Sequence, residues 1–354
     1  MIKIDGSMGE GGGQILRMSV ALSAVLGLPV KIYNIRKKRS PSGLRPQHLN
    51  AVKALAMLSD ADIQGLHIGS EEIEFIPREL KGGNFKIDIG TAGSISLMLQ
   101  ALLPAAVFSR KQVNLEIRGG SDVPWSPPID YMRMVFLPTI KKMGANIEIE
   151  LIRRGHYPKG GGIVRAIINP VKKLESIRIT EPGKVIKIKG ISHAVRLPSH
   201  VAERQANSAI EILRKNGFNN IEIIREYYER NKDPHIGPGS GITLWAITEK
   251  SILGGDALGA RGKPAEKVGE EAARKLLNEI NSGAAFDRHM GDMLVIWSYL
   301  ANGLSEYTTS ELTLHAKTCL DLIKIFNPNA EIRVEGDIGK PSRITIRGIS
   351  FEGY

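Results

Sequence analysis

The sequence predicts a mixed α/β (α+β) protein in which helices cover one face of small β-sheets. Two observations predict this class. Apolar helices and short β-rich runs are interleaved along the 354 residues, and one unit recurs several times: a glycine-rich turn, an apolar helix and then β-rich runs. Such repetition predicts a pseudo-symmetric scaffold. Residues from about 184 to 282 break this pattern.

Four copies of the unit follow one another along the chain. The first has a helix over GQILRMSVALSAVLG, the strand PVKIYNI and a helix over RPQHLNAVKALAMLS, where Pro46 suits the first turn. The second has FKIDIG, the helix SISLMLQALLPAAVF and VNLEIRGG. The third has the helix SPPIDYMRMVFLPTIKKMGA, then NIEIELIRRG and IVRAIINP. The last has the helices HMGDMLVIWSYLANG and SELTLHAKTCLDLIKIF, then AEIRVEG and SRITIRGI.

The interrupting segment has elements of its own. It contains the β-rich runs VIKIKGI, NIEIIREYY and ITLWAITEK and the helices VAERQANSAIEILRKNG and EKVGEEAARKLLNEI. Its loop ERNKDPHIGPGSG is rich in Gly and Pro, as is typical of an irregular surface segment. We therefore expect a catalytic domain of repeats over 1–183 and 283–354, with a smaller inserted domain over 184–282.

The charge balance points to a polyanionic partner. Lys and Arg number 48 against 37 Asp and Glu, a net charge of +11, and clustered cations gain free energy by displacing counterions from phosphates. Aromatic residues make up only 5%, which argues against a platform that stacks several unpaired bases in a row. The predicted target is a nucleic-acid terminus or backbone.

Other features of the sequence indicate the cellular compartment of the protein. No window approaches the roughly 18 uncharged apolar residues of a membrane span, and the N-terminal MIKIDGSMGE lacks the apolar core of a signal peptide. The single cysteine, Cys319, excludes an internal disulfide and cysteine-rich zinc patterns. We expect a cytoplasmic protein with no membrane partner.

Glycine-rich turns are the first candidate sites for phosphate. Neither G-x-x-x-x-G-K-[ST] nor G-x-G-x-x-G occurs, so the common nucleotide motifs are absent. Backbone N–H groups in a glycine turn can approach an anion closely, and a helix that starts there adds its positive end. The alternative is a tight strand-to-helix turn. The four turns are Gly9–Gly13, which precedes the helix with Arg17, and Gly90–Gly93, Gly160–Gly162 and Gly237–Gly241.

A basic run supplies a second candidate. IRKKRSPSGLRPQH holds five cations and no acid, and it leads into a helix that starts near Gln47 and His48. An anion there would meet both side-chain cations and backbone donors, although such runs are often solvated loops. Nearby, Lys3–Gly6 (KIDG) matches the pattern of lysine-adenylylating ligases, but Lys3 more simply starts an edge strand. The five cations are Arg36, Lys37, Lys38, Arg39 and Arg45.

His315 is the candidate nucleophile. We expect Ser310 to cap its helix, with Glu311 in the first turn. A histidine at the edge of an apolar stripe is often a satisfied core residue. Near a helix N-terminus, however, the dipole keeps the imidazole neutral, the state that attack on phosphorus needs. One helix earlier, His289 and Asp292 share a face, and no known metal spacing includes these residues.

The stretch RGHYPKGGGIV, residues 154–164, resembles the signature of the RNA 3′-terminal phosphate cyclase family. DGSMGEGGGQILR, GLRPQHL, GTAGS, GGSDVPWSPP and the VAER helix resemble that family in the same order, so the resemblance spans about residues 2 to 348. It implies repeated units of a four-stranded sheet with two helices, an EPSP-synthase-like scaffold, and a smaller inserted domain. It also implies ATP-dependent conversion of an RNA 3′-phosphate to a 2′,3′-cyclic phosphate through histidine-AMP and RNA-adenylate intermediates, with release of AMP and pyrophosphate.

The resemblance also assigns residues. It implies that His315 is the nucleophile, that Asp292, Arg17, Arg39 and Glu10 complete the catalytic set, and that Glu10 holds Mg²⁺ or Mn²⁺. The implied ATP site contains Gln14, Pro127, His289, Asp292 and His315. The implied RNA-end site contains Arg17, Arg36, Arg39 and Gln47. The sequence departs from the family at His289, where a stacking tyrosine is expected, and at Met293, where a glutamine is expected.

Two rival functions remain at this stage. A cyclase-like ribosome-assembly or RNA-processing factor would resemble this chain but would not adenylylate, and an EPSP-synthase-like transferase would bind small anionic metabolites. His315 and the basic set favour a cyclase with ATP and RNA 3′-phosphate ends as partners. Whether the chain forms a homodimer stays open.

Overall fold

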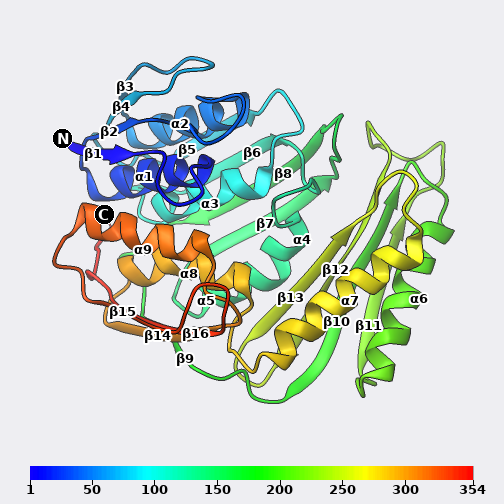
Figure 1. The fold of residues 1–354 in the computed structure, drawn as a ribbon. Coiled ribbons are helices and arrows are strands. Elements are labelled where there is room, and N and C mark those ends of the chain that lie inside the picture. Colours follow the sequence, from blue (N-terminus) through cyan, green and yellow to red (C-terminus); the bar gives the residue numbers. More distant parts are fainter. Residues whose placement is uncertain (354) are drawn as a thin grey trace.

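The structure, a computed structural model, describes residues 1–353 and repeats one β-α-β-α-β-β unit (Figure 1). In the first unit, strand β1 pairs in parallel with β2, and β4 lies between β2 and β3, so that the sheet order is β1-β2-β4-β3. The elements of this unit are β1 (Ile2–Asp5), α1 (Gly13–Leu26), β2 (Val30–Tyr33), α2 (Pro46–Ser59), β3 (Asp62–Gln64) and β4 (Ile73–Ile76).

The second unit has the same topology, with the order β5-β6-β8-β7. Its second helix is divided into α4, a π-helical turn over Met132–Phe136, and α5. The elements are β5 (Gly83–Asp88), α3 (Ile95–Ala106), β6 (Val113–Gly119), α4 (Ile129–Tyr131), α5 (Leu137–Lys141), β7 (Asn146–Arg153) and β8 (Gly162–Asn169).

The third unit begins with a short strand and continues about a hundred residues later, in the order β9-β14-β16-β15. Its elements are β9 (Arg178–Ile179), α8 (Arg288–Leu300), β14 (Leu304–Thr309), α9 (Leu314–Phe326), β15 (Ile332–Glu335) and β16 (Ser342–Arg347).

These topologies confirm the predicted class and the repetition, but they correct the number of copies. The second and third predicted copies form one sheet, because β6 pairs in parallel with β5 and antiparallel with β8. Counting helix-and-strand runs cannot reveal which strands share a sheet, since pairing is a tertiary property.

Between β9 and α8 lies a separate unit, on the right in Figure 1. Its sheet has the order β11-β10-β12-β13, which differs from the repeat, and its two helices pack against each other over an apolar cluster of their own. The elements are β10 (Val185–Val195), α6 (His200–Lys215), β11 (Ile221–Tyr227), β12 (Gly239–Thr248), β13 (Ile252–Leu258) and α7 (Ala265–Asn281).

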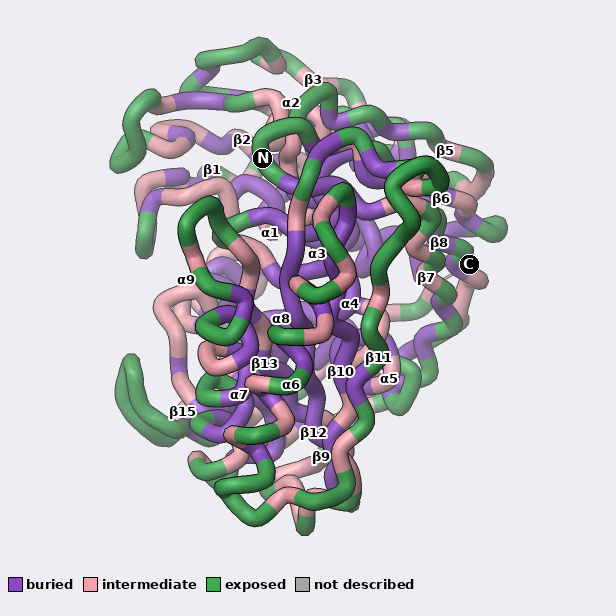
Figure 2. The backbone as a smooth tube through the Cα atoms, turned by 90° about the vertical axis from the view of Figure 1, so that its right-hand side faces the viewer, coloured by how far each residue is buried: buried purple, intermediate pink, exposed green. Residues whose placement is uncertain are grey.

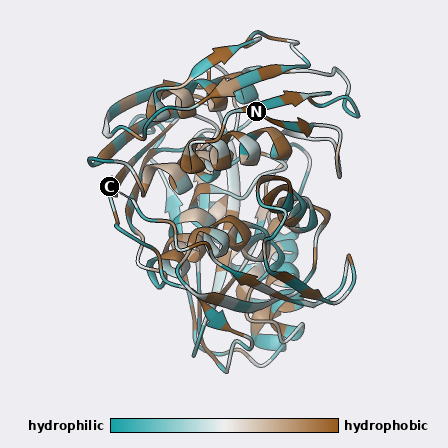
Figure 3. Ribbon diagram, turned by 90° about the vertical axis from the view of Figure 1, so that its left-hand side faces the viewer, coloured by the Kyte–Doolittle hydropathy of each residue, from teal (hydrophilic) through white to brown (hydrophobic). Residues whose placement is uncertain are grey.

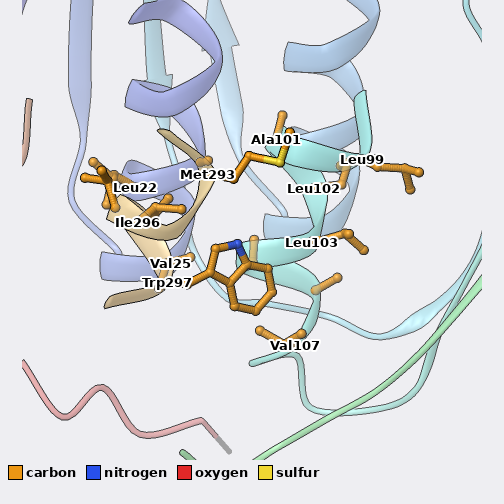
Figure 4. Packing of buried hydrophobic residues seen from close by; sticks show 14 of the residues in the cluster. Leu22, Val25, Leu99, Ala101, Leu102, Leu103, Val107, Met293, Ile296 and Trp297 are labelled. Carbon is orange, nitrogen blue, oxygen red and sulfur yellow. The ribbon is translucent and has the colours of Figure 1, made fainter. Parts of the chain in front are cut away.

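Helices of the three repeated units meet in one continuous core. Helix α1 contacts α2, α3 and α9, and α8 contacts α3 and α9. Trp297 of α8 packs among Val25 of α1 and Leu103 of α3 (Figure 4), and buried segments run through the middle of the molecule (Figure 2). Strands at the periphery alternate buried apolar and more exposed polar residues (Figure 3). This packing brings the N-termini of α1 and α9 together.

Within residues 1–353, none of the helices has the length and apolar character needed to cross a bilayer.

Candidate active site

The Gly9–Gly13 turn leads into α1, and its geometry leaves the helix start open. Gly12 is the N-cap in extended conformation, no side chain caps the helix, and the first turn holds no acid. The His48 ring closes over the turn: a Cβ at Gly13 would lie 2.0 Å from His48 Nε2 and 3.1 Å from Arg17 Nη1. Only glycine fits there, and the first N–H groups of α1 remain available to an anion.

Helix α9 positions His315 directly opposite this turn. Gln14 Nε2 donates to the His315 carbonyl oxygen at 3.0 Å, so its amide oxygen faces the ring and hydrogen-bonds Nδ1. With the proton on Nδ1, the lone pair of the ring is on Nε2, which lies 3.4 Å from Glu10 Oε2. Burial lowers the pKa of His315; Glu10 opposes this, while Arg17 and Arg39 add to it. The ring is therefore neutral, with Nε2 directed at the site.

Helix α9 begins later than predicted. Its N-cap is Thr313, whose Oγ1 accepts from Ala316 N at 3.0 Å, and not Ser310. The backbone N–H groups of Ser310 and Leu312 instead donate to the carbonyls of Phe286 and Lys340, and neither residue belongs to the helix. His315 is consequently the second residue of the helix, closer to its positive end than the sequence prediction placed it.

Asp292 of α8 reaches the same helix start. Thr313 Oγ1 donates to Asp292 Oδ1 at 2.5 Å, so one threonine joins the α9 cap to the carboxyl group. Burial raises the pKa of Asp292 to about 8, although the Thr313 hydrogen bond opposes this. Near neutral pH the group is mostly protonated and can donate a hydrogen bond.

Two of the predicted arginines, Arg17 and Arg39, lie beside the Gly9–Gly13 turn. Arg39 Nη2 lies 3.2 Å from Glu10 Oε2. Arg17 is buried, and burial lowers its pKa to about 10, which still leaves it cationic at neutral pH. Cations on two sides of an open helix start are an arrangement that can bind an anion.

Not all of the remaining predicted residues contact Glu10, Arg39 or His315. Arg36 and Gln47 form their hydrogen bonds elsewhere. Arg36 Nη1 donates to the carbonyls of Pro41 and Gly43, both at 2.9 Å, and so closes its own loop. Gln47 Oε1 accepts from Ser94 N at 3.1 Å and thereby holds the Gly90–Gly93 turn beside α2. Lys3 lies on β1, the edge strand of the first sheet, where the simpler interpretation placed it.

His289 and Pro127, the two residues predicted to stack on adenine, differ in their exposure to solvent. His289 is exposed on α8, edge-on to Tyr131 with ring centroids 5.9 Å apart. Pro127, in the loop before α4, is buried. In this conformation Pro127 offers no open face.

Sequence reasoning missed three residues that shape the site. Thr313 could have been found as an N-cap, because it stands directly before Leu314 and three residues before Ala316 of the apolar stripe. Asp287 caps α8, accepts from Gly254 N at 2.8 Å and accepts from the Tyr131 hydroxyl at 2.6 Å. No sequence signal indicates the Asp287–Tyr131 bond, because its partners lie 156 positions apart.

The RGHYPKGGGIV stretch has a different role. Arg154, 1% exposed, pairs with Asp130 at 2.7 Å, with Glu226 of β11 at 2.6 Å and with Asp122 at 3.3 Å. His156 lies so close to Gly239 that a Cβ there would be 2.0 Å from its ring, and Gly239 begins β12, so that the predicted Gly237–Gly241 turn is partly a strand. The stretch thus joins the repeated body to the 184–282 segment.

Asp122, His156 and His193 come close enough to suggest a metal site, since their ligand atoms lie within 4.8 Å of one another. The Asp122 carboxylate, however, already accepts from Arg154 and from Ser121 Oγ, the latter at 2.6 Å. The two imidazole Nε2 atoms contact each other at 3.0 Å. The hydrogen bonds and ion pairs around Arg154 therefore account for this cluster without a metal ion.

Comparisons with known proteins agree with one another. The family described as RNA 3′-terminal phosphate cyclase matches residues 8–333. A protein of Ignicoccus hospitalis named RNA 3′-terminal phosphate cyclase is 55% identical over 99% of this chain and 100% of its own length. A protein of Staphylothermus marinus with the same name is 56% identical over 99% of each chain. An EPSP synthase structure from Acinetobacter baumannii aligns over 99% of this chain and 66% of its own, at 10% identity and a TM-score of 0.25, too weak a likeness to support a conclusion.

Proposed function

Because the chain belongs to the RNA 3′-terminal phosphate cyclase family and is an enzyme of that family, we propose that it converts an RNA 3′-phosphate to a 2′,3′-cyclic phosphate in three steps. First, His315 Nε2 attacks the α-phosphorus of ATP, and the bond to the pyrophosphate leaving group breaks. Second, an oxygen of the RNA 3′-phosphate attacks the same phosphorus, and the P–N bond breaks. Third, the neighbouring 2′-hydroxyl attacks the 3′-phosphorus, and AMP leaves as the hydroxyl proton passes to solvent.

The observation that carries this proposal is the orientation of His315. Gln14 holds the ring through Nδ1 and leaves Nε2 facing Glu10 at 3.4 Å. Burial favours the neutral ring, which is the nucleophilic form. A histidine that served only the core would be enclosed, whereas the His315 side chain is 45% exposed and presents Nε2 beside Glu10.

Charge around the site supports phosphate chemistry. Arg17, Arg39 and the open start of α1 are proposed to bind the phosphates of ATP and of the RNA end, with Gln47 and Arg36 bordering the RNA side. Asp292, protonated near neutral pH, is proposed to donate a hydrogen bond to the nucleotide.

The carboxylate of Glu10 fits a divalent ion that is shared with substrate. It is partly exposed, and its Oε2 lies between Arg39 and His315. Mg²⁺ commonly uses one or two protein carboxylates together with water and phosphate oxygens, so Glu10 would hold Mg²⁺ or Mn²⁺ without a full protein cage. Such an ion would neutralise charge on the phosphates.

The adenosine end of the ATP site is proposed at the start of α8. Gln14 and Asp292 adjoin His315, and exposed His289 offers a ring on the same helix face as Asp292. Pro127 can pack on the adenine only if its loop shifts to expose it. We also propose that 1–183 and 283–354 form the catalytic domain and that 184–282 form an inserted domain, since the latter has its own sheet and apolar cluster.

Covalent labelling tests the proposal. With α-labelled ATP and Mg²⁺ or Mn²⁺, the wild-type protein should form an acid-labile AMP adduct and release one pyrophosphate per active site without RNA. His315→Ala should abolish the adduct, and the matched control Lys3→Ala should retain it. An AMP mapped to Lys3, or no adduct at all, would contradict the histidine mechanism, and the latter result would favour a non-adenylylating factor.

The RNA end tests the later steps. A terminus with a 3′-phosphate but a 2′-deoxy sugar retains the oxygen that accepts AMP and lacks the nucleophile for closure. Adenylylated ends should accumulate with no cyclic product. Cyclisation without ATP, or pyrophosphate release that strictly requires RNA, would exclude this order of steps.

A further inference from the structure

The loop between β6 and α4 presents one tryptophan to solvent. Its base is closed by a hydrogen bond from Ile129 N to Ser121 O at 2.9 Å. Trp125, at its tip, is 95% exposed, while Trp245 and Trp297 are 6% and 2% exposed. A large apolar side chain so fully exposed contributes almost nothing to the stability of the fold.

The backbone at Trp125 is held in an unfavourable conformation. Its φ is +63°, in the left-handed region that a bulky residue rarely adopts. The loop is fastened on the other side as well, because Ser121 N and Asp122 N both donate to the Gly155 carbonyl, at 2.9 and 3.1 Å. The surrounding structure thus maintains a strained, exposed indole, a combination that is found where function requires it.

The loop runs from the family signature stretch to the candidate active site. At one end, the backbone of Asp122 forms an isolated parallel β-bridge with His156 of the signature stretch. At the other end, the ring of Tyr131 lies edge-on to the ring of His289 on α8, with their centroids 5.9 Å apart. Trp125 and Tyr131 are six positions apart in the chain, a span of at most about 20 Å. Trp125 therefore lies within reach of a polymer whose end is bound at His315.

The signature loop that pairs with this loop also carries groups that suit a nucleic acid. In the paired signature loop, Tyr157 is 67% exposed, and Lys159 is exposed with no acidic partner within 4.0 Å among residues 1–353. Aromatic faces and an unpaired cation on two loops joined by the Asp122–His156 bridge can bind a base by stacking and a phosphate by charge. A protein partner would be expected to cover a wider apolar surface than one side chain.

We propose that the exposed face of Trp125 stacks on one nucleobase of the RNA, upstream of the terminal 3′-phosphate, and so positions the end for reaction. This inference rests on the proposed function, because it needs RNA as the substrate. One such platform agrees with the low aromatic content, which argues only against a row of stacked bases. The adenine of ATP has the same stacking chemistry and is the alternative occupant that the test must separate.

The test compares RNA 3′-phosphates of increasing length. Trp125→Ala should raise the KM for RNAs of several nucleotides about tenfold, in line with alanine substitutions of stacking residues. It should change KM little for a nucleoside 3′-phosphate, which has no upstream base, and it should change kcat little. Trp125→Phe should restore most of the loss. Tyr227→Ala, at an exposed aromatic of β11, is the matched control and should behave as wild type.

A second variant separates binding from folding. Trp125→Gly removes the indole but suits φ +63°, so it should lose RNA affinity as Trp125→Ala does while its melting temperature stays equal or rises. A KM unchanged at every RNA length for both variants would overturn the inference and leave the cyclase proposal intact.

Fluorescence keeps the inference testable even if the cyclase proposal fails. Because the other two tryptophans are buried, quenching by a short RNA 3′-phosphate should be lost in Trp125→Phe. Quenching by ATP alone would assign the platform to the nucleotide and refute the RNA assignment. Absence of any RNA quenching in the wild type would refute it as well.

Discussion

Replacing Asp292 with asparagine should stabilise the protein in a pH-dependent way. Burial raises the pKa of Asp292 from 3.8 to about 8 in the folded state. Because the folded value lies above the unfolded one, the stability that protonated Asp292 contributes is full below pH 3.8 and is lost as the pH rises towards 8. Asparagine resembles the protonated carboxyl group, can still accept from Thr313 Oγ1 and has no charge to lose.

The shift sets the size of the effect. pH 7 lies about three pH units above 3.8, the pKa of Asp292 in the unfolded chain. At 1.36 kcal/mol per unit, ionisation of Asp292 therefore lowers the free energy of unfolding by about 4 kcal/mol at pH 7. Asp292 retains some exposure, which screens part of this, so we expect Asp292→Asn to be more stable by about 3 kcal/mol at pH 7. Near pH 4 the two proteins should be equally stable.

Urea unfolding of both proteins between pH 4 and pH 8.5 measures this difference. Asp337→Asn, at an exposed position, is the matched control and should change stability little at any pH. In parallel, the KM of Asp292→Asn for ATP in the adenylylation assay should stay close to the wild-type value, because the amide can donate a hydrogen bond as the protonated carboxyl group does. A stability difference that is constant with pH, or a variant less stable throughout, would refute the account of Asp292.

Two further predictions concern charged contacts. Arg39→Lys should raise the KM for RNA 3′-phosphate about tenfold, because a point charge cannot reproduce bidentate contacts to phosphate; wild-type cyclisation at limiting RNA by this variant, with Arg214→Lys as control, would place the phosphate elsewhere. Glu226→Gln should lose about 3 kcal/mol at pH 7, because burial opposes its ionisation but Arg154 outweighs this and lowers its pKa to about 2 from 4.5. This difference in the free energy of unfolding is full above pH 4.5 and should shrink as the pH falls towards 2. Urea unfolding at several pH values measures it. A difference that persists at pH 2 would contradict the Glu226–Arg154 ion pair as its cause.

Much of the site could be predicted because its parts are local. The glycine turn before Arg17, the proline at the start of α2 and the basic run are patterns within a few residues. Arg36 shows the limit of such patterns. It shares a basic run with Arg39, yet its guanidinium closes its own loop while Arg39 reaches Glu10.

The sequence by itself determined most of the helices and several of the strands, and which of their faces are apolar, because these depend on side-chain periodicity. It also determined the family, through motifs kept in order along the chain. Only the tertiary structure decided that the strands form three repeated sheets and that Gln14 orients His315 from 301 positions away. Such contacts arise when packed helices bring distant segments together, and no local pattern encodes their partners.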